Sequence, residues 1–239
     1  MIEKIKEPDE LNAWTKRDIF TVRILSLLKS YGCKYDFATY YKQVIDGEIT
    51  AVMSKLDGDF TLSINDNADI AELVHFFCVT GFTSILCSDT FTFGARYDEG
   101  VIMQCDTKMD YNLGGATLDE YPKLMDLFNF VDYNSQDFKS WYVDISHRVR
   151  HKTAKAYTLC IDDTIIASGI LSSIIDGYAI LTAVRCEPEF RGMGYGSALV
   201  SAICNDVKGR VYIMRDEGLN EDFYARLGFK DIAGWRIYR

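Results

Sequence analysis

The sequence predicts a mixed α/β fold of the α+β type, with a mostly antiparallel sheet flanked by helices. Three observations lead to this prediction. Strand-like segments follow one another across short turns, at Asp46-Gly47, Asp57-Gly58, Asp162-Asp163 and Asp176-Gly177. Near residue 190 a strand runs into a glycine loop that opens a helix. A further apolar strand follows that helix, so a βαβ unit is joined to antiparallel hairpins.

The first half of the chain is expected to begin with a helix and continue as strands. Residues 1–32 are expected to be helical, with Ile24, Leu25, Leu27 and Leu28 as an apolar face and Gly32 as the end of the helix. Strands are expected from Thr39 to residue 56, at 59–64 and at 83–88, with a helix at 68–79 between the last two. TFTFGARY and GVIMQC are two further strand candidates.

The glycine-bearing stretch MDYNLGGAT, residues 109–117, predicts a domain boundary, which gives domains at 1–112 and 113–239. Two helices are expected next, the first capped by Asp119 with Pro122 in its first turn, and the second with Phe138, Trp141, Ile145 and Val149 on its apolar face. Strands at 156–161, 164–171 and 178–186 follow. A helix to about Asp206, strand 211–215, a helix at 220–227 and a closing strand complete the chain.

A weak internal repeat relates the two halves. With Tyr41 set against Tyr157, 116 residues later, Ile45, Asp46, Ile49 and Ala51 match Ile161, Asp162, Ile165 and Ala167. Two strand pairs can resemble each other by chance, so the first half is either a second copy of the same fold or an unrelated α/β domain with a structural role.

Composition excludes several classes of protein. With 48% hydrophobic and 26% charged residues, the 239-residue chain has the profile of a soluble globular protein. It has no apolar signal segment and no run long enough to span a membrane, which predicts a cytoplasmic protein. The seven cysteines and three histidines show no metal-ligand spacing, so no metal is expected. A net charge of −9 argues against nucleic acid and favours a cationic substrate.

The glycine loop from Arg191 to Gly196 carries the chemistry. Successive backbone N–H groups at such a loop, with the positive end of a helix dipole behind them, form a cradle for a pyrophosphate. Glycines let the ligand approach without a Cβ in the way. The sequence R-G-M-G-Y-G is not G-x-G-x-x-G, and no Lys-Ser/Thr pair follows as in a P-loop.

This loop resembles the acetyl-CoA motif of GNAT-type N-acetyltransferases, R/Q-x-x-G-x-G/A, with Arg191, Gly194 and Gly196 in its fixed positions and Pro188 before it. A second segment, from Asn220 through Tyr224 to Gly228-Phe229, is similar to the family's N-x-x-x-x-x-F-Y-x-x-x-G-F region in compressed form. A surface helix with a glycine cap would explain the second segment alone, whereas both segments in this order favour the family.

The resemblance implies a GNAT-like sheet whose central strands splay into a V, and two such lobes in tandem if the repeat is real. It implies acetyl-CoA in the V, with its pantetheine paired to the strand edge at Val184 and Cys186 and its pyrophosphate on the loop amides. The implied cofactor-binding residues are Val184, Cys186, Arg191, Gly192, Met193, Gly194, Tyr195, Gly196, Ser197 and Asn220. In the first half, Asn65-Asp66-Asn67-Ala68-Asp69 stands where this cradle should lie, and its aspartates would repel phosphate.

By the same resemblance Tyr224 is the general acid that protonates the departing thiolate. The general base is left open, because strand 178–186 contains no carboxylate. Glu187 or Asp176 could act through water, although both also fit solvated turn residues, and a nucleophilic role for Cys186 is remote.

We therefore predict an N-acetyltransferase that moves the acetyl group of acetyl-CoA to a primary amine of a small cationic molecule. Two alternatives stay open: a non-catalytic acyl-CoA sensor, and the same fold acting with a longer acyl group or on a protein N-terminus. Assembly as a homodimer is also left open.

Overall fold

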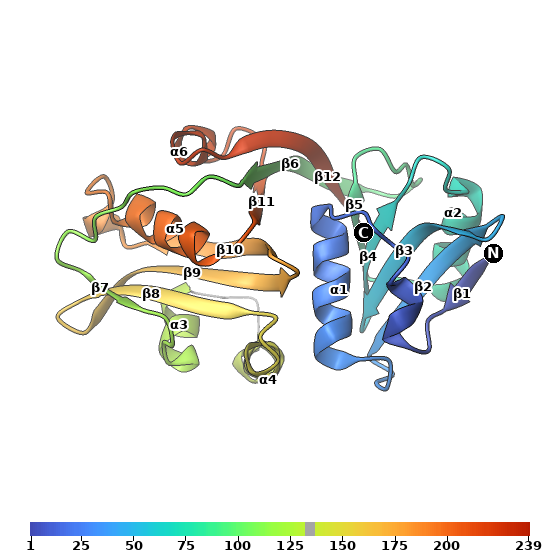
Figure 1. Ribbon diagram of the computed structural model, residues 1–239, viewed down its shortest axis with the longest axis horizontal. Helices are drawn as coiled ribbons and strands as arrows, with labels where there is room; N and C mark the ends of the chain where they lie inside the picture. The colour runs from blue at the N-terminus through green and yellow to red at the C-terminus, as the bar shows by residue number, and fades with distance from the viewer. Residues whose placement is uncertain (132–136) are drawn as a thin grey trace. The chain divides into compact units, whose positions relative to one another are not determined.

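The computed structural model describes residues 1–131 and 137–239 (Figure 1). These residues form two compact units. Unit 1 comprises Met1–Ile102, Met214–Glu217 and Ile232–Arg239, and unit 2 comprises Met103–Ile213 and Gly218–Asp231. This division by compactness assigns residues 103–112 and the end of the chain differently from the expected domains 1–112 and 113–239, which remain a prediction about domain organisation.

Unit 1 is a sheet in the order β1-β2-β3-β4-β5-β12 with a helix on each face. Val52 belongs to the apolar cluster under α1, and its neighbours Ala51 and Met53 belong to the cluster under α2, as alternation along a strand requires. The elements are β1 (Ile2–Lys4), the 3-10 turn η1 (Pro8–Leu11), α1 (Ile19–Tyr31), β2 (Ala38–Ile45), β3 (Glu48–Leu56), β4 (Asp59–Ile64), α2 (Ile70–Thr80), β5 (Ser84–Ser88), β6 (Tyr97–Cys105, whose last three residues lie in unit 2) and most of β12 (Lys230–Tyr238).

Two expectations for the first half are wrong. The helix covers only the last part of residues 1–32, because Ile2–Lys4 pairs with β2 across about 40 residues and Asp18 caps α1 by accepting from the Thr21 N–H at 2.7 Å. Gly32 ends α1 as expected, with a φ of 61°. TFTFGARY contributes only Tyr97 to a strand, since Phe91 and Phe93 instead pack in the aromatic core against Tyr238.

Unit 2 is a sheet in the order β11-β10-β9-β8-β7. Helices α3 and α4 cover one face over Ala154, Ala156 and Ile170. Helix α5 covers the other so closely that a Cβ on Gly169 would lie 2.7 Å from Ile203 Cδ1. The elements are β7 (Thr117–Asp119), α3 (Leu124–Val131), α4 (Phe138–Arg150), β8 (Lys155–Ile161), β9 (Thr164–Ile175), β10 (Tyr178–Cys186), the 3-10 turn η2 (Pro188–Phe190), α5 (Tyr195–Asp206), β11 (Arg210–Asp216, whose last three residues lie in unit 1) and α6 (Glu221–Arg226).

The expected cap at Asp119 is wrong. Asp119 ends strand β7, and its carboxylate accepts from the Tyr121 N–H at 2.8 Å in a turn. Helix α3 therefore begins only at Leu124. The second helix begins where its apolar pattern indicates, and Asp137 caps it by accepting from the Ser140 N–H.

The internal repeat extends to the strand register. Gln43 pairs with Ala51 and Val44 with Ile49, and 116 residues later Leu159 pairs with Ala167 and Cys160 with Ile165. Both hairpins therefore have a bulge at the same place, between Gln43 and Val44 in the first half and between Leu159 and Cys160 in the second. The next elements also agree, because β4 pairs in parallel with β5 and β10 with β11, with α2 and α5 as the crossover helices.

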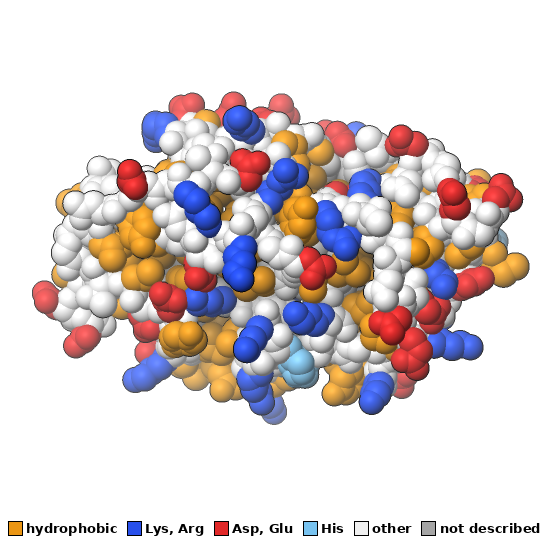
Figure 2. Space-filling view, in the orientation of Figure 1, with side chains coloured by type: hydrophobic (Ala, Val, Ile, Leu, Met, Phe, Trp, Pro, Cys, Tyr) orange, Lys and Arg blue, Asp and Glu red, His pale blue; other side chains and the backbone are white. Residues whose placement is uncertain are grey.

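No helix in the described ranges is both long and apolar enough to cross a bilayer. Basic and acidic side chains are interspersed over the face seen in Figure 2, although the chain carries a net charge of −9.

Candidate functional site

A cavity of about 580 Å³ opens in unit 2 beside the end of β10. Its walls come from β10, the loop after it, the first turn of α5, and α6. The lining residues are Val184, Arg185, Cys186, Phe190, Arg191, Gly192, Gly194, Gly196, Ser197, Asn220, Phe223, Tyr224 and Arg226.

Strand β10 separates from β11 as it approaches this cavity, while it stays paired with β9. It pairs with β11 only from Tyr178 to Ile180, so its last six residues have no β11 partner. On the β9 side, Thr182 pairs with Ile170 and Arg185 with Ser168, which leaves a bulge at Ala183, where φ is 53°. The divergence and the bulge together expose the backbone edge of β10 from Ala183 onward, where an extended ligand could pair with it.

The loop after β10 forms an open cradle at the start of α5. Gly192 and Gly194 have φ values of 76° and 90°, which a residue with a Cβ adopts at a cost, and no described atom lies within 4 Å of the position that a Cβ would take at either. Gly194 is the N-cap of α5, so no side chain caps the helix. Apart from that of Gly196, which contacts the Cys186 thiol, the N–H groups of its first turn stay available for an anion.

Arg191 is fixed at the edge of the cradle, because its Nε donates to the carbonyl of Cys186 at 3.0 Å. Arg185 and Arg226 also line the cavity, and none of its described lining residues is Asp, Glu or His. The net charge of the chain is negative, yet this cavity is lined by cations and suits an anionic ligand.

Helix α6 brings Tyr224 to the cavity. Asn220, with a φ of 56°, turns the chain into the helix without capping it by its side chain. The Tyr224 ring packs edge-on against Phe223 and Phe229, with centroids 4.9 and 5.5 Å away. Burial raises the pKa of Tyr224 to about 12. The phenol is therefore protonated at neutral pH and can donate a proton or a hydrogen bond.

Two buried thiols lie next to this helix. Cys105 Sγ contacts the carbonyl of Leu227 at 3.6 Å, and a hydrogen bond from the Cys204 thiol lowers the pKa of Cys105. These contacts tie the end of α6 to β6 and α5. Burial, opposed by the nearby Arg191, raises the pKa of Cys186 at the cavity wall, so its thiol is a poor nucleophile at neutral pH.

The cavity gathers most of the residues expected from the sequence. Nine line it: Val184, Cys186, Arg191, Gly192, Gly194, Gly196, Ser197, Asn220 and Tyr224. Met193 points outward, with 66% of its surface exposed, and Tyr195 packs on Phe190 and donates to the carbonyl of Gly114 at 3.4 Å. The roles of all these residues in binding stay predictions.

Four lining residues were not anticipated: Arg185, Phe190, Phe223 and Arg226. Phe190, Phe223 and Arg226 lie inside or directly beside the two motifs, and their position in the sequence could have indicated them. Of the two candidate bases, Glu187 lies just outside the lining, 3.9 Å from the Arg185 guanidinium. Asp176 is in the turn at the opposite end of β10, on the order of 30 Å away by strand rise. A direct role for Asp176 at this cavity is therefore excluded.

Comparisons with known proteins agree with this geometry. Residues 119–229 match the model of the Acetyltransferase (GNAT) family. Among solved structures, a GCN5-related N-acetyltransferase from Kribbella flavida superposes with a TM-score of 0.60 at 14% identity, over 92% of this chain and 93% of its own. A Drosophila protein gives 0.66 at 13% identity, over 99% and 97%. No curated protein sequence matches the chain.

A tandem GNAT protein from the clavulanic acid biosynthesis pathway superposes with a TM-score of 0.59 at 11% identity, over 100% of this chain and 97% of its own. At these identities the superpositions establish the fold alone. The predicted GNAT-like mixed sheet, with its splayed strands and flanking helices, is confirmed.

Proposed function

Residues 119–229 form a domain of the GNAT acetyltransferase family, and from this we propose that the protein transfers an acetyl group from acetyl-CoA to a primary amine. The observation that carries the proposal is one cavity that combines an uncapped helix start, a free strand edge and a protonated tyrosine. Each supplies one requirement of the reaction: binding of the diphosphate, alignment of the thioester, and a proton for the leaving group.

The cradle fits the diphosphate of acetyl-CoA. The open space beside Gly192 and Gly194 admits a bulky anion, and the first-turn N–H groups of α5 can donate to it. Arg191 adds a guanidinium at the rim. We assign Met193, Tyr195 and Ser197 to the same site through their backbone, because the outward side chain of Met193 contributes none. Asn220 supplies an amide at the opposite wall.

The edge of β10 would hold the pantetheine and the thioester. Val184 and Cys186 lie in the part of β10 that has left β11, so their backbone groups on that side can pair with the amides of an extended pantetheine. A backbone N–H beside the bulge at Ala183 would polarise the thioester carbonyl.

In the proposed reaction the amine nitrogen of the acceptor attacks the carbonyl carbon, a C–N bond forms, and the C–S bond breaks. Tyr224 donates its phenolic proton to the departing thiolate, and the amine loses one proton to water. With its pKa raised to about 12 by burial, the Tyr224 phenol is protonated at neutral pH, as a proton donor must be. We assign no side chain as general base, since the described lining holds no carboxylate or imidazole.

The absence of a base in the described lining also favours the second candidate, a non-catalytic acyl-CoA sensor. The two candidates differ in turnover. We expect the wild-type protein to acetylate members of an amine panel and Tyr224→Phe to do so at least about 100-fold more slowly. Tight binding of acetyl-CoA without turnover of any amine would favour the sensor instead.

Binding itself is tested by calorimetric titration with acetyl-CoA. We expect one site of micromolar affinity. No binding would remove the basis of both candidates. We further propose that the protein is cytoplasmic and that it acts without a metal or a nucleic-acid partner. Whether it forms a homodimer is left open. The preference for a cationic acceptor rests on net charge alone, and the arginine-lined cavity gives it no support.

A further inference from the structure

Arg185 occupies a different face of unit 2 from the phosphate cradle. Successive side chains of a strand point to opposite faces. Cys186 lies against the start of α5, with its Cβ 4.0 Å from the position a Cβ would take on Gly196. Arg185 instead lies against α3, where its Nη1 donates to the carbonyl of Val131 at 3.1 Å and its guanidinium lies 5.6 Å from the centre of the Phe130 ring.

Arg185 nevertheless lines the same cavity as the cradle. The cavity thus reaches past the edge of β10, from the α5 face to the α3 face. If acetyl-CoA enters from the cradle and runs along β10, the acceptor must reach the thioester from the remaining side. Arg185 is a cation on that side.

Among the residues that the structure describes, the contacts of the guanidinium leave some of its donors unused. It carries five N–H groups, and Val131 accepts from one nitrogen. Glu187 lies 3.9 Å from Nη2, beyond hydrogen-bonding distance, and about a third of the Arg185 side chain is exposed. The contacts to α3 fix the orientation of the fork, so a planar anion could bind it without reordering the side chain.

We propose that the acceptor carries a carboxylate beside its amine, as an amino acid does, and that Arg185 binds this carboxylate. The proposal rests on the acetyltransferase function proposed above and names its substrate class. A guanidinium and a carboxylate match in geometry and form paired charge-assisted hydrogen bonds. The described lining contains no carboxylate, and the Glu187 carboxylate, which lies outside it, stays 3.9 Å from Nη2.

The test compares acceptors that differ only in the carboxylate, such as phenylalanine with phenethylamine and lysine with cadaverine, at saturating acetyl-CoA. We expect the wild-type protein to acetylate an acid in preference to its matched amine, by roughly 10- to 100-fold in kcat/KM. Arg185→Gln should reduce that ratio to near one, mainly through KM, and Arg185→Lys should give an intermediate ratio.

Arg226→Gln is the matched control, because it removes another cavity arginine from α6 on the cradle side. It should leave the acid-to-amine ratio unchanged. Thermal unfolding checks that each variant is folded, and calorimetry checks that it still binds acetyl-CoA. A wild-type preference for amines, or an unchanged ratio in Arg185→Gln, would overturn the proposal. So would a loss of acetyl-CoA affinity in Arg185→Gln at an unchanged ratio.

If no acceptor turns over, the acetyltransferase proposal fails separately, and binding then decides the question. Calorimetric titration of the CoA-loaded protein with the same acids and amines should show binding of an acid that Arg185→Gln loses. Absence of acid binding to the wild-type protein would overturn the assignment of Arg185.

Discussion

In both units a parallel strand pair starts directly after an Asp-Gly turn, with Asp59 opposite Ser84 in unit 1 and Tyr178 opposite Arg210 in unit 2. Both pairs run for three residues. Beyond them, β4 continues for three residues and β10 for six. At about 3.3 Å per residue the free edge in unit 2 is roughly 10 Å longer, and only that edge carries a positive-φ bulge, at Ala183.

The crossover helices differ at their first residue. Asp69 caps α2 by accepting from the Glu72 N–H at 3.0 Å, and Gln43 in turn binds the backbone of Asp69 at 3.0 Å. Gly194 leaves the start of α5 without a side chain. The Asp69 carboxylate occupies one N–H donor at the start of α2, and its negative charge would repel a phosphate there.

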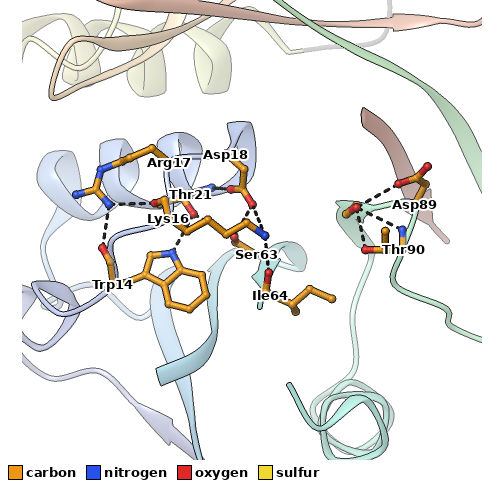
Figure 3. Close-up of polar contacts among 10 residues, drawn as sticks. Trp14, Lys16, Arg17, Asp18, Thr21, Ser63, Ile64, Asp89 and Thr90 are labelled. Carbon is orange, nitrogen blue, oxygen red and sulfur yellow. Dashed lines mark hydrogen bonds and ion pairs between the residues drawn. The ribbon is translucent and has the colours of Figure 1, made fainter. Parts of the chain in front are cut away.

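Side chains also cover the end of β4. Lys16 donates to the carbonyl of Ile64 and pairs with Asp18 at 3.1 Å, and Ser63 donates to Asp18 at 2.8 Å (Figure 3). In unit 2 the carbonyl at the end of β10, that of Cys186, accepts instead from Arg191 of the cradle itself. The two units share one arrangement of strands and crossover helix. Where side chains of the unit itself bond the helix start and the strand end, as in unit 1, these groups contribute to stability; where the groups stay open, as in unit 2, they can bind a ligand. We propose that the first half is a degenerate copy that does not bind CoA.

The largest effect that separates the units is expected from Gly194→Glu. A carboxylate in the cradle would meet the diphosphate and lose hydration, which costs several kcal/mol, so acetyl-CoA affinity should fall more than about 1,000-fold. Calorimetry measures it. Glutamate at position 194 would have to adopt a φ of 90°, which can destabilise the fold. Ser197→Glu, within α5, therefore places a carboxylate at the same site without this backbone strain.

The matched change in unit 1, Asn67→Glu in the loop before α2, should leave affinity and the one-site stoichiometry unchanged. Two sites in the wild-type protein would show that the first half binds CoA and would break the comparison.

Tyr224→Phe should lower kcat at least about 100-fold without weakening acetyl-CoA binding, because it removes the proposed acid and keeps the ring packing. Steady-state kinetics with the best acceptor measures it. Tyr238→Phe in unit 1 is the control, since that hydroxyl donates to the carbonyl of Phe91 at 2.8 Å and serves packing. Equal losses of kcat in both variants would argue for a structural role of Tyr224.

Asp69→Ala should lower the free energy of unfolding by about 1 kcal/mol, the usual contribution of an N-cap, with no effect on acetyl-CoA affinity. Asp18→Ala should cost about as much or more, because Asp18 caps α1 and also accepts from Ser63. Urea unfolding measures both. Arg191→Ala in unit 2 should have the opposite effect: it should weaken acetyl-CoA binding and leave the free energy of unfolding nearly unchanged. A loss of binding in Asp69→Ala would contradict the assignment of that cap to structure.

The sequence predicted the parts of the site that are contiguous in the chain. Arg191 to Ser197, Asn220 and Tyr224 belong to short segments whose local conformation, a glycine loop or a helix start, follows from the residues themselves. Arg185 was missed because its direction depends on the bulge at Ala183, which arises from pairing with β9.

Non-local pairing also explains the errors in the fold. Residues 2–4 form a strand because β2 is there to pair with them, and Asp119 ends β7 because β8 pairs with it. Neither partner is close in sequence, so local propensity favoured helix at both places. The hairpins were predicted correctly, since Asp-Gly turns and alternating strands are local signals.

The smallest expected effect concerns pH. Burial raises the pKa of Tyr224 to about 12, so below about pH 11 the phenol keeps its proton and kcat at saturating substrates should show no alkaline limb due to this residue. The sign follows from the protonated form being the active one: activity would fall only as pH rises through the folded-state pKa. Profiles of kcat for wild type and Tyr224→Phe should therefore have the same shape between pH 7 and 10 and differ by a constant factor. An alkaline limb that Tyr224→Phe abolishes would mean that Tyr224 ionises in the working range, and the residue would then be better placed as a base toward the amine than as an acid toward the thiolate.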